Sequence, residues 1–247
     1  MISNASFAGS TGTMDVPAPD WIEADPELFS QWGMFLLAMI KHGTVEATSR
    51  DQSLPMRHTE FGLLIEGGIY ALDQPAEDDG RRVLIHFHKR GDLFISAISP
   101  SLPFQLNAHC RTTCLVIREQ AIEHFKADFP AWDRLIPVLR AGMAQNYSRA
   151  ISAAAGRDQD RILRVLSILA AHPTAIETKL GREIEAGKQR IRELAGVQKR
   201  SASRAFQALE NAGYVSFYGY KRIFYREPQS EGKTFLNQHQ QTGAVCQ

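Results

Sequence analysis

The stretch KQRIRELAGVQKRSASRAFQALENAGYV, residues 188–215, holds two short amphipathic segments separated by the break AGV. In the second segment apolar residues recur at the i, i+3, i+4 and i+7 spacing of a buried helical face, at Ala202, Ala205, Phe206 and Leu209. Two positions earlier the same spacing carries Arg200, Ser203, Arg204 and Gln207. At about 100° per residue these side chains lie nearly opposite the apolar ones. We therefore predict a helix with one buried face and one basic, polar face.

The residues on either side of this helix complete a recognisable module. The preceding segment is apolar at Ile191, Leu194 and Ala195, and Gly196 suits a tight turn between two helices. After the second segment, YVSFYGYKRIFYR predicts two aromatic-rich strands about Gly219. Two helices joined by a tight turn and followed by a hairpin indicate a winged helix-turn-helix. Two surface helices with a solvated basic face remain the alternative.

Charge is distributed unevenly along the chain of 247 residues, although the net charge is only +1. Residues 1–156 hold 13 Lys+Arg and 18 Asp+Glu, a net charge of −5, whereas residues 157–247 hold 15 and 9, a net charge of +6. A basic C-terminal part beside an acidic N-terminal part fits a polyanionic partner for the former. We expect that partner to be double-stranded DNA.

The dimensions of the major groove suggest roles for the polar side chains of this module. An α-helix fits the groove, where arginine can bind guanine through two hydrogen bonds and serine can donate or accept at several bases. The predicted base-reading residues are Lys199, Arg200, Ser201, Ser203 and Arg204. Phosphate contacts position a protein on the duplex without reading its sequence. The predicted phosphate contacts are Lys188, Gln189, Gln207, Lys221 and Arg222.

The N-terminal half has the pattern of a β-domain. FGLLIEGGIYALD predicts strands on both sides of Gly67-Gly68, and RRVLIHFH, FQLNAHC and TTCLVIR predict three more. GDLF is interpreted as a turn and SPSLP as a loop. In RRVLIHFH the alternation of Val83, Ile85 and Phe87 with other residues predicts that one face packs inward. Short strands at close spacing favour a small antiparallel barrel or jelly roll.

A long helix is expected between the barrel and the basic module. After Pro137, VLRAGMAQNYSRAISAAAG runs to Gly156 with Gly142 as its only weak helix former. An apolar stripe follows helical spacing at Ile136, Leu139, Met143, Tyr147, Ala150 and Ala154. We predict that this stripe pairs with its copy in a homodimer. Packing of the stripe on its own barrel is the alternative.

The predicted fold class is α+β, with an N-terminal antiparallel barrel, a long dimerisation helix and a C-terminal winged helix-turn-helix. The sequence contains no run of about 18 apolar residues, so we predict no membrane-spanning helix. Its N-terminal residues lack the pattern of a signal peptide. We therefore expect a cytoplasmic protein with no membrane partner. The expected organisation is an arm at 1–20, a sensor barrel at 21–130, the dimerisation helix at 131–156, the DNA-binding domain at 157–228 and a tail at 229–247.

From about residue 30 to residue 226 the chain resembles the Crp/Fnr family of bacterial transcription regulators. LLIEGGIYAL, GRRVLIHFHKRGDLF and TTCLVIREQAIEHFKADFP look like the strands and short helix of that family's cyclic-nucleotide-binding-like barrel, and LAGVQKRSASRAFQALENAGYV like its recognition segment. The resemblance implies a homodimer that binds palindromic DNA and contacts RNA polymerase. It also implies that Arg204 contacts guanine and that Ser203 matches a serine of the Fnr-like branch.

Two residues depart from the family pattern in the recognition segment. Arg200 stands where most members carry a glutamate that reads cytosine, so arginine should prefer guanine or phosphate. Gln198 replaces the customary serine at the helix start, which weakens the N-cap by about 1 kcal/mol.

The barrel also lacks the groups with which family members bind a cyclic nucleotide. Ile95-Ser96 and Phe104-Gln105 occupy the positions of the Gly-Glu and Arg-Ser/Thr pairs. A phosphate buried without its arginine is unfavourable, so we expect no tight binding of cyclic AMP. By resemblance, an unknown small-molecule effector would contact Ile95, Ser96, Gln105, Met143 and Tyr147.

Two other classes of protein stay open as alternatives. A haem-based sensor could use His42, His58, His86, His88 or Cys110 as a ligand. A metal-dependent enzyme of the cupin type could use His86, His88 and Asp92, with His109 as a possible substitute for the missing second motif. Our main reading assigns no catalytic residue, no metal ligand and no cofactor, and expects no enzymatic activity.

Overall fold

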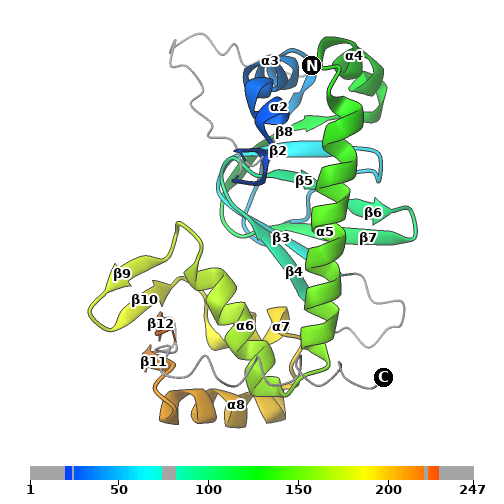
Figure 1. The fold of residues 1–247 in the computed structure, drawn as a ribbon. Coiled ribbons are helices and arrows are strands. Elements are labelled where there is room, and N and C mark those ends of the chain that lie inside the picture. Colours follow the sequence, from blue (N-terminus) through cyan, green and yellow to red (C-terminus); the bar gives the residue numbers. More distant parts are fainter. Residues whose placement is uncertain (1–19, 24, 74–81, 220–221, 228–247) are drawn as a thin grey trace, which may run out of the picture. The chain divides into compact units, whose positions relative to one another are not determined.

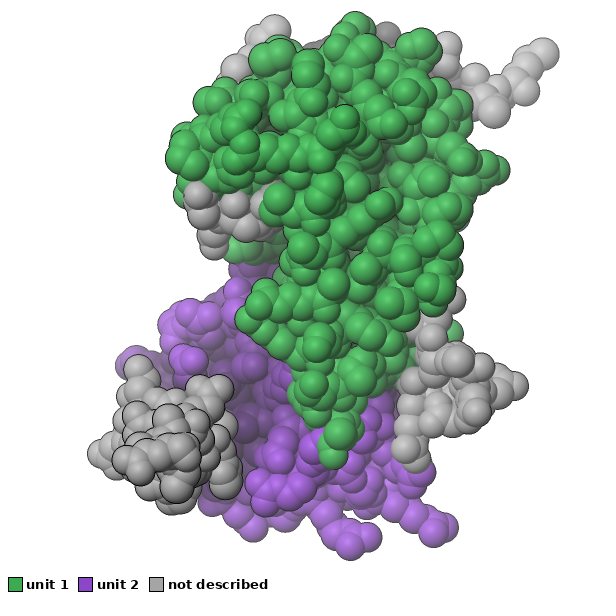
Figure 2. Space-filling view, turned by 45° about the vertical axis from the view of Figure 1, so that its right-hand side comes forward, with its two compact units in different colours: residues 1–155 green, residues 156–247 purple. Residues whose placement is uncertain are grey.

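The computed structural model describes residues 20–23, 25–73, 82–219 and 222–227. The chain divides into two compact units, Met1–Ala155 and Gly156–Gln247, which are drawn in different colours in Figure 2. The first unit is an antiparallel β-domain with helices, and the second is a small helical domain with an antiparallel sheet (Figure 1). The predicted α+β class, with a barrel, a long helix and a winged helix-turn-helix, is confirmed. None of the described helices combines the length and the hydropathy that crossing a membrane requires.

The first unit begins with helices and then forms most of its strands. Its helices are α1 (Asp20–Glu23), α2 (Pro26–Ser30), α3 (Trp32–His42), the 3-10 turn η1 (Glu119–Ala121), α4 (Ile122–Asp128) and α5 (Trp132–Ala154). Its strands are β1 (Thr44–Thr48), β2 (Phe61–Glu66), β3 (Ile69–Asp73), β4 (Leu84–His88), β5 (Leu93–Ile95), β6 (Ala97–Ser99), β7 (Leu102–Ala108) and β8 (Thr112–Ile117).

Two four-stranded antiparallel sheets build the barrel, in the orders β1-β8-β2-β5 and β4-β3-β7-β6. The turn between β2 and β3 contains Gly67, whose φ of 89° explains the glycine there. The prediction of a turn at GDLF is wrong for its last two residues, because Leu93 and Phe94 belong to β5 and pair with β2. SPSLP is likewise not a plain loop, since β6 and β7 pair across it, Ala97 opposite Pro103.

Strand β4 is buried on both faces, which corrects the expected alternation. Leu84, Ile85, Phe87 and His88 are all buried and only His86 is partly exposed. One face lies inside the barrel, while α5 packs along the strand as well. Alternation with a period of two residues indicates that one side of a strand faces solvent. A helix packed over the sheet covers that side, so both faces of the strand are buried.

The close approach of Gly62 and Phe94 joins β2 to β5 inside the first sheet. These two residues are paired across the strands, and a Cβ on Gly62 would lie 2.3 Å from Cζ of Phe94. The Phe94 ring, fully buried, therefore occupies the space that a side chain at position 62 would need.

Aromatic rings from several elements fill the end of the barrel near α3 and α4. Phe61 of β2 meets Phe125 edge-on with centroids 5.1 Å apart and lies 4.5 Å from the Trp132 ring. Phe35 of α3 meets Phe125 and Phe129 in the same edge-on manner. Edge-to-face aromatic pairs contribute about 0.5–1.5 kcal/mol beyond their buried area. This cluster fixes the N-terminal end of α5, which starts at Trp132.

Helix α5 begins at Trp132, five residues before Pro137 and one residue after the predicted start at 131, so the proline lies inside the helix. A proline inside a helix costs about 3 kcal/mol because it removes one hydrogen bond and crowds the preceding turn. Trp132, Leu135 and Ile136 are buried in that first part, and each contributes about 1.5–3 kcal/mol by leaving water. Packing therefore outweighs the cost of the proline.

The second unit surrounds its first helix with a sheet and two further helices. It consists of α6 (Asp158–Ala170), β9 (Ile176–Thr178), β10 (Gly181–Ile184), α7 (Lys188–Leu194), α8 (Lys199–Asn211), β11 (Val215–Tyr218) and β12 (Arg222–Tyr225). The sheet has the order β11-β12-β10-β9 and all its pairs are antiparallel. Helix α6 contributes the centre of the core through Ile162, Val165, Leu166 and Leu169.

Candidate nucleic-acid interface

The turn between α7 and α8 is defined by Gly196. Its φ of 60° lies in the left-handed region that favours glycine. The Val197 amide donates to the carbonyl of Arg192 at 3.0 Å, which closes the C-terminal end of α7. The guanidinium of Arg161, on α6, donates to the Gly196 carbonyl at 2.7 Å. The angle between the two helices is thus fixed by backbone geometry and by a side chain from a third helix.

The apolar face of α8 packs into the core of the second unit as its spacing predicts. Ala202, Ala205, Phe206 and Leu209 are buried, and so are Ile191 and Leu194 of α7. Helix α8 packs mainly against α6, and its end leads through Gly213, at a φ of 76°, into β11. Because this face is buried, the rotation of α8 about its axis is determined and the opposite face must point to solvent.

The solvent-facing side of α8 carries the polar residues that the sequence selected for base reading. Lys199, Arg200, Ser203 and Arg204 are exposed, and Ser201 is half-buried with its hydroxyl donating to the Gln198 carbonyl at 3.2 Å. Among the described residues, none of the four exposed side chains has a hydrogen bond or an ion pair. Three cationic side chains are thus free to bind an external anion or base edge.

The start of α8 lacks a side-chain cap. Gln198 occupies the N-cap position with φ −67° and ψ 148°, and its side chain forms no capping hydrogen bond. The first amides of a helix have no acceptor within the helix, and they carry the positive end of its dipole. This end of α8 therefore remains available to an acceptor from outside the chain.

The side chains predicted to contact phosphate differ in how far they are already engaged. The ammonium of Lys188 lies over the ring of Phe217, 3.5 Å from its centroid. The amide of Gln189 donates to Glu193 at 3.0 Å, and that of Gln207 donates to Asn211 at 3.2 Å. Arg222 forms an ion pair with Glu183 at 3.3 Å. Lys221 lies outside the described residues.

A groove of about 470 Å³ runs between α7 and α8. Predicted interface residues line it from both helices, together with Arg192, which the sequence analysis did not select. Arg192 follows Lys188 by four residues and so shares its face of α7, a spacing that could have identified it. The lining residues include Lys188, Gln189, Arg192, Lys199, Ser203 and Gln207.

The stripe predicted for the dimer interface lies mostly in the core of the first unit. Ile136, Leu139, Met143 and Ala150 are buried there, whereas Tyr147 and Ala154 are partly exposed. The four buried residues therefore pack within their own unit. Among the residues expected around an effector, Ile95, Ser96 and Met143 are buried, whereas Gln105 and Tyr147 are partly exposed.

Ile95 and Met143 belong to the core, and the Tyr147 ring lies 6.3 Å from that of Phe104. The hydroxyl of Ser96 donates to the Arg57 carbonyl at 2.7 Å, and the Gln105 amide donates to the hydroxyl of Ser53 at 2.9 Å. These five predicted effector residues therefore form no single group of polar side chains directed at one ligand.

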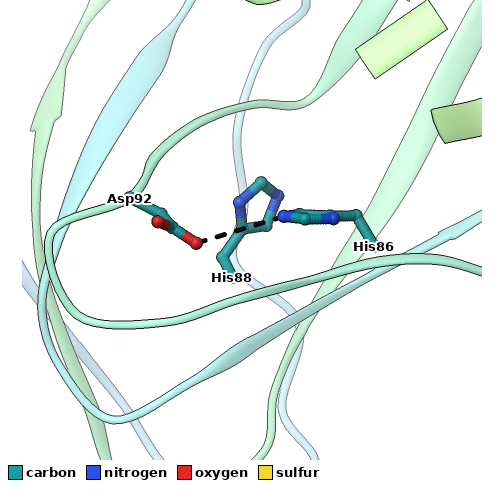
Figure 3. Close-up of side chains that lie close together, drawn as sticks. All are labelled: His86, His88 and Asp92. Carbon is teal, nitrogen blue, oxygen red and sulfur yellow. Dashed lines mark ion pairs between the residues drawn. The ribbon is translucent and has the colours of Figure 1, made fainter. Parts of the chain in front are cut away.

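The histidines considered for haem or metal binding are spread over the first unit. His42 lies 2.6 Å from the carboxylate of Asp128, His58 is exposed, and His109 forms a hydrogen bond with the hydroxyl of Tyr70. Cys110 is partly exposed. Only His86 and His88 lie together, beside Asp92 (Figure 3).

Comparisons with known proteins agree with this architecture. No family model and no curated protein matches the sequence. Among solved structures, the chain is similar to the c-di-GMP responsive global regulator CLP of Xanthomonas campestris, with 18% identity over 79% of this chain and 100% of that chain and a TM-score of 0.64. FixK2 of Bradyrhizobium japonicum is 18% identical over 75% of this chain and 93% of that chain, with a TM-score of 0.58.

A transcriptional regulator of the Crp/Fnr family from Thermus thermophilus is 17% identical over 74% of this chain and 94% of that chain, with a TM-score of 0.55. At these identities the likeness concerns the fold. The chain has the two-domain fold of the Crp/Fnr transcription regulators, which confirms the resemblance noted in the sequence.

Proposed function

We propose that the protein is a sequence-specific DNA-binding transcription regulator that uses α8 as its recognition helix. The observation that carries this proposal is the outer face of α8. There Lys199, Arg200 and Arg204 are exposed and have no partner among the described residues. A helix face that is merely solvated usually carries acidic residues or intrahelical ion pairs as well. The first turn of α8 contains no acidic residue. Unpaired cations on a helix that fits the major groove suit DNA.

Different side chains would have different roles on the duplex. Arg200 and Arg204 can each form two hydrogen bonds with guanine, so the half-site should be rich in G·C pairs. Lys188 and Lys221 would bind phosphates and position the module without selecting bases. The uncapped amides at the start of α8 would add a phosphate contact.

A homodimer would bring two copies of α8 onto one palindromic site, with half-sites about one helical turn apart. Since the inner stripe of α5 packs on its own barrel, we propose that the partner helix meets the outer face. Exposed residues on that face include Val138, Ala141, Gln145, Ser148 and Ser152. Val138 on this outer face is 40% exposed, which is a large fraction for a valine side chain.

The alternative of a cupin-type enzyme has less support. It needs a further histidine besides His86 and His88, and His109 is engaged by Tyr70. The solved structures compared above include a global regulator and a transcriptional regulator of the Crp/Fnr family. We therefore propose no catalytic activity.

The signal that the barrel would receive is a separate question. Phe104 is buried at the position where a cyclic-nucleotide-binding barrel carries its phosphate-binding arginine, which supports the proposal that cyclic AMP is not the effector. Contact with RNA polymerase belongs to the proposal through the resemblance alone.

Selection of bound fragments from a random duplex library tests this function most directly. Full-length protein should enrich a palindrome, and fluorescence anisotropy should show tighter binding to it than to a shuffled duplex at physiological salt. The binding constant should fall steeply as salt rises, because counterions are released from phosphates. Equal affinity for the selected and the shuffled duplex would overturn the proposal.

A further inference from the structure

The strand β4 places two imidazoles on the same face, and the following turn adds a carboxylate. His86 and His88 are two positions apart, so their side chains project from the same side of the strand. Their rings lie 4.6 Å apart at an interplanar angle of 74°. Nε2 of His86 lies 4.0 Å from Oδ2 of Asp92, the contact drawn as a dashed line in Figure 3. One ligand atom from each of the three residues lies within 4.8 Å of the other two.

His88 is the member of this cluster that the rest of the fold does not explain. It is 1% exposed, and neither of its ring nitrogens has a hydrogen-bond partner. Buried polar side-chain atoms nearly always have one. The ring instead lies beside the rings of His86 and Phe94. In Figure 3 its ring is drawn between Asp92 and His86, and one of its nitrogens lies within 4.8 Å of a ligand atom of each.

The turn after β4 holds the carboxylate of Asp92 in place. Its Oδ2 accepts from the amide of Lys89 at 2.8 Å, and the Asp92 amide donates to the Lys89 carbonyl at 3.0 Å. Gly91 in this tight turn has a φ of 89°, which lies in the left-handed region that favours glycine. The carboxylate is therefore oriented before any ligand arrives.

The long helix supports His86 from the other side. Nδ2 of Asn146, on α5, lies 3.4 Å from Nδ1 of His86. A histidine that binds a metal through Nε2 carries its proton on Nδ1, and an amide oxygen is a suitable acceptor for that proton. A half-turn of the Asn146 amide presents its oxygen to His86, so Asn146 is suited to the role of a positioning residue.

We propose that His86, His88 and Asp92 form a binding site for a divalent transition-metal ion. Two imidazoles and one carboxylate suit zinc or iron(II) better than magnesium or calcium, which prefer oxygen ligands alone. Metal–ligand bonds of about 2.0–2.2 Å bring ligand atoms nearer to one another than they lie here, so the side chains would close around the ion by about 1 Å.

The cluster offers a cation one carboxylate, that of Asp92, beside two imidazoles, and neither ring nitrogen of His88 is engaged in a hydrogen bond. Three protein ligands leave at least one coordination position for water or a small molecule. The side chains of His86 and Asp92 are 37% and 16% exposed, which gives the ion a route from solvent.

This inference does not depend on the proposed function, because it can be tested without DNA. Full-length protein without an affinity tag is stripped with a chelator, dialysed and titrated with Zn²⁺ against a chromophoric competitor, and separately with Co²⁺. We expect one equivalent per chain, visible Co²⁺ absorption bands of a site with nitrogen ligands, and a higher melting temperature with metal. Binding of less than one equivalent would overturn the proposal.

Variants separate the three ligands from the rest of the surface. His86→Gln and Asp92→Asn keep the size of the side chain, and Asp92→Asn also keeps an oxygen for the Lys89 amide. Each should weaken Zn²⁺ binding at least tenfold and abolish the metal-dependent rise in melting temperature. The exposed His58 provides the matched control, and His58→Gln should bind as the unaltered protein does. Unchanged affinity in His86→Gln would refute the site.

Two further variants distinguish a ligand from a structural residue. His88→Leu removes an imidazole that has no hydrogen bond, so the metal-free variant should fold and melt no lower than the unaltered protein, yet bind no Zn²⁺. Asn146→Ala should weaken binding by about 10–100-fold while leaving the stoichiometry at one. Retention of full Zn²⁺ affinity in a folded His88→Leu protein would contradict the assignment of His88.

Discussion

Lys188 places its ammonium 3.5 Å from the centroid of the Phe217 ring, so the first residue of α7 is held against the first strand of the wing. The same ring meets Phe206 of α8 edge-on, with centroids 5.8 Å apart. One aromatic side chain therefore connects both helices of the helix-turn-helix to the hairpin that follows them.

Replacement of Lys188 by methionine keeps the aliphatic stem and removes the charge. We expect the free energy of unfolding to fall by about 0.5–1 kcal/mol because the cation–π contact is lost. The slope of DNA affinity against salt should fall by about one, since one phosphate contact is lost. Urea denaturation and anisotropy measure the two effects. Lys199→Met is the control, because exposed Lys199 has no ring contact among the described residues and should change DNA binding alone.

Replacement of Arg204 by alanine tests base reading by α8. Loss of two hydrogen bonds to guanine should cost about 1–3 kcal/mol on the selected palindrome and relax the preference at one base pair of each half-site. Anisotropy with a set of single-substituted duplexes measures both. Stability should hardly change, because the side chain is exposed. An equal loss of affinity on selected and random duplexes would show that Arg204 contacts phosphate instead.

Arg118 neutralises a buried carboxylate in the barrel. Its Nη1 lies 2.8 Å from Glu60, which is 4% exposed, and it also pairs with Glu46. Replacement by methionine would leave Glu60 buried without its cation and should lower the free energy of unfolding by about 3–5 kcal/mol. Thermal and urea denaturation check this.

A second substitution, Glu60→Gln, should restore part of the stability lost in Arg118→Met, because it removes the unpaired charge. Arg57 offers a matched control, since it pairs with Glu119 at 2.6 Å but is 74% exposed. Arg57→Met should cost about 0–1 kcal/mol. Similar losses for Arg57→Met and Arg118→Met would contradict the importance of burial.

Ala141 lies on the outer face of α5, where we propose that the partner helix packs. Ala141→Arg should shift the protein from dimer to monomer in sedimentation equilibrium and weaken binding to the palindrome more than binding to a single half-site. Asp133→Arg, at an exposed position of the first turn of α5, serves as a control for the added charge. A dimer that tolerates Ala141→Arg would place the interface elsewhere.

Burial raises the pKa of the Cys114 thiol to about 12, and the nearby carboxylate of Glu46 acts in the same direction. Because the thiolate is the reactive form, iodoacetamide at pH 8 should modify the partly exposed Cys110 well before Cys114. Peptide mass spectrometry after timed quenching measures both rates.

The same shift has a consequence for stability. A thiol whose pKa is higher in the folded than in the unfolded state contributes fully below its unfolded pKa of about 9, and this contribution is lost as pH rises from there toward 12. Raising the pH from 8 to 10 should therefore lower the free energy of unfolding less in Cys114→Ala than in the unaltered protein.

The sequence predicted those features that depend on local geometry. The buried face of α8 follows from helical spacing, and Gly196 marks the turn because few other residues adopt its φ. The turn at Gly67 between β2 and β3 is local in the same sense. The strand β1, Thr44–Thr48, was not predicted, because its half-polar residues gain their order from pairing with the distant β8.

Periodicity also predicted that one face of α5 is buried but could not say against what. The stripe with Leu139 and Met143 meets the barrel, and only the structure shows this. Likewise, neither ring nitrogen of the buried His88 has a hydrogen-bond partner. This depends on every element packed around the residue. The sequence alone placed His86 and His88 in a cupin-type metal motif whose second part is missing.

The contact between Gly62 and Phe94 limits how this barrel can change over evolutionary time. A mutation that adds even a methyl group at position 62 collides with the aromatic ring, and a mutation that shrinks residue 94 first leaves an empty space behind. Each single step is thus harmful, whereas the two together can be tolerated. Descendants of this gene should therefore exchange these two amino acids jointly or not at all.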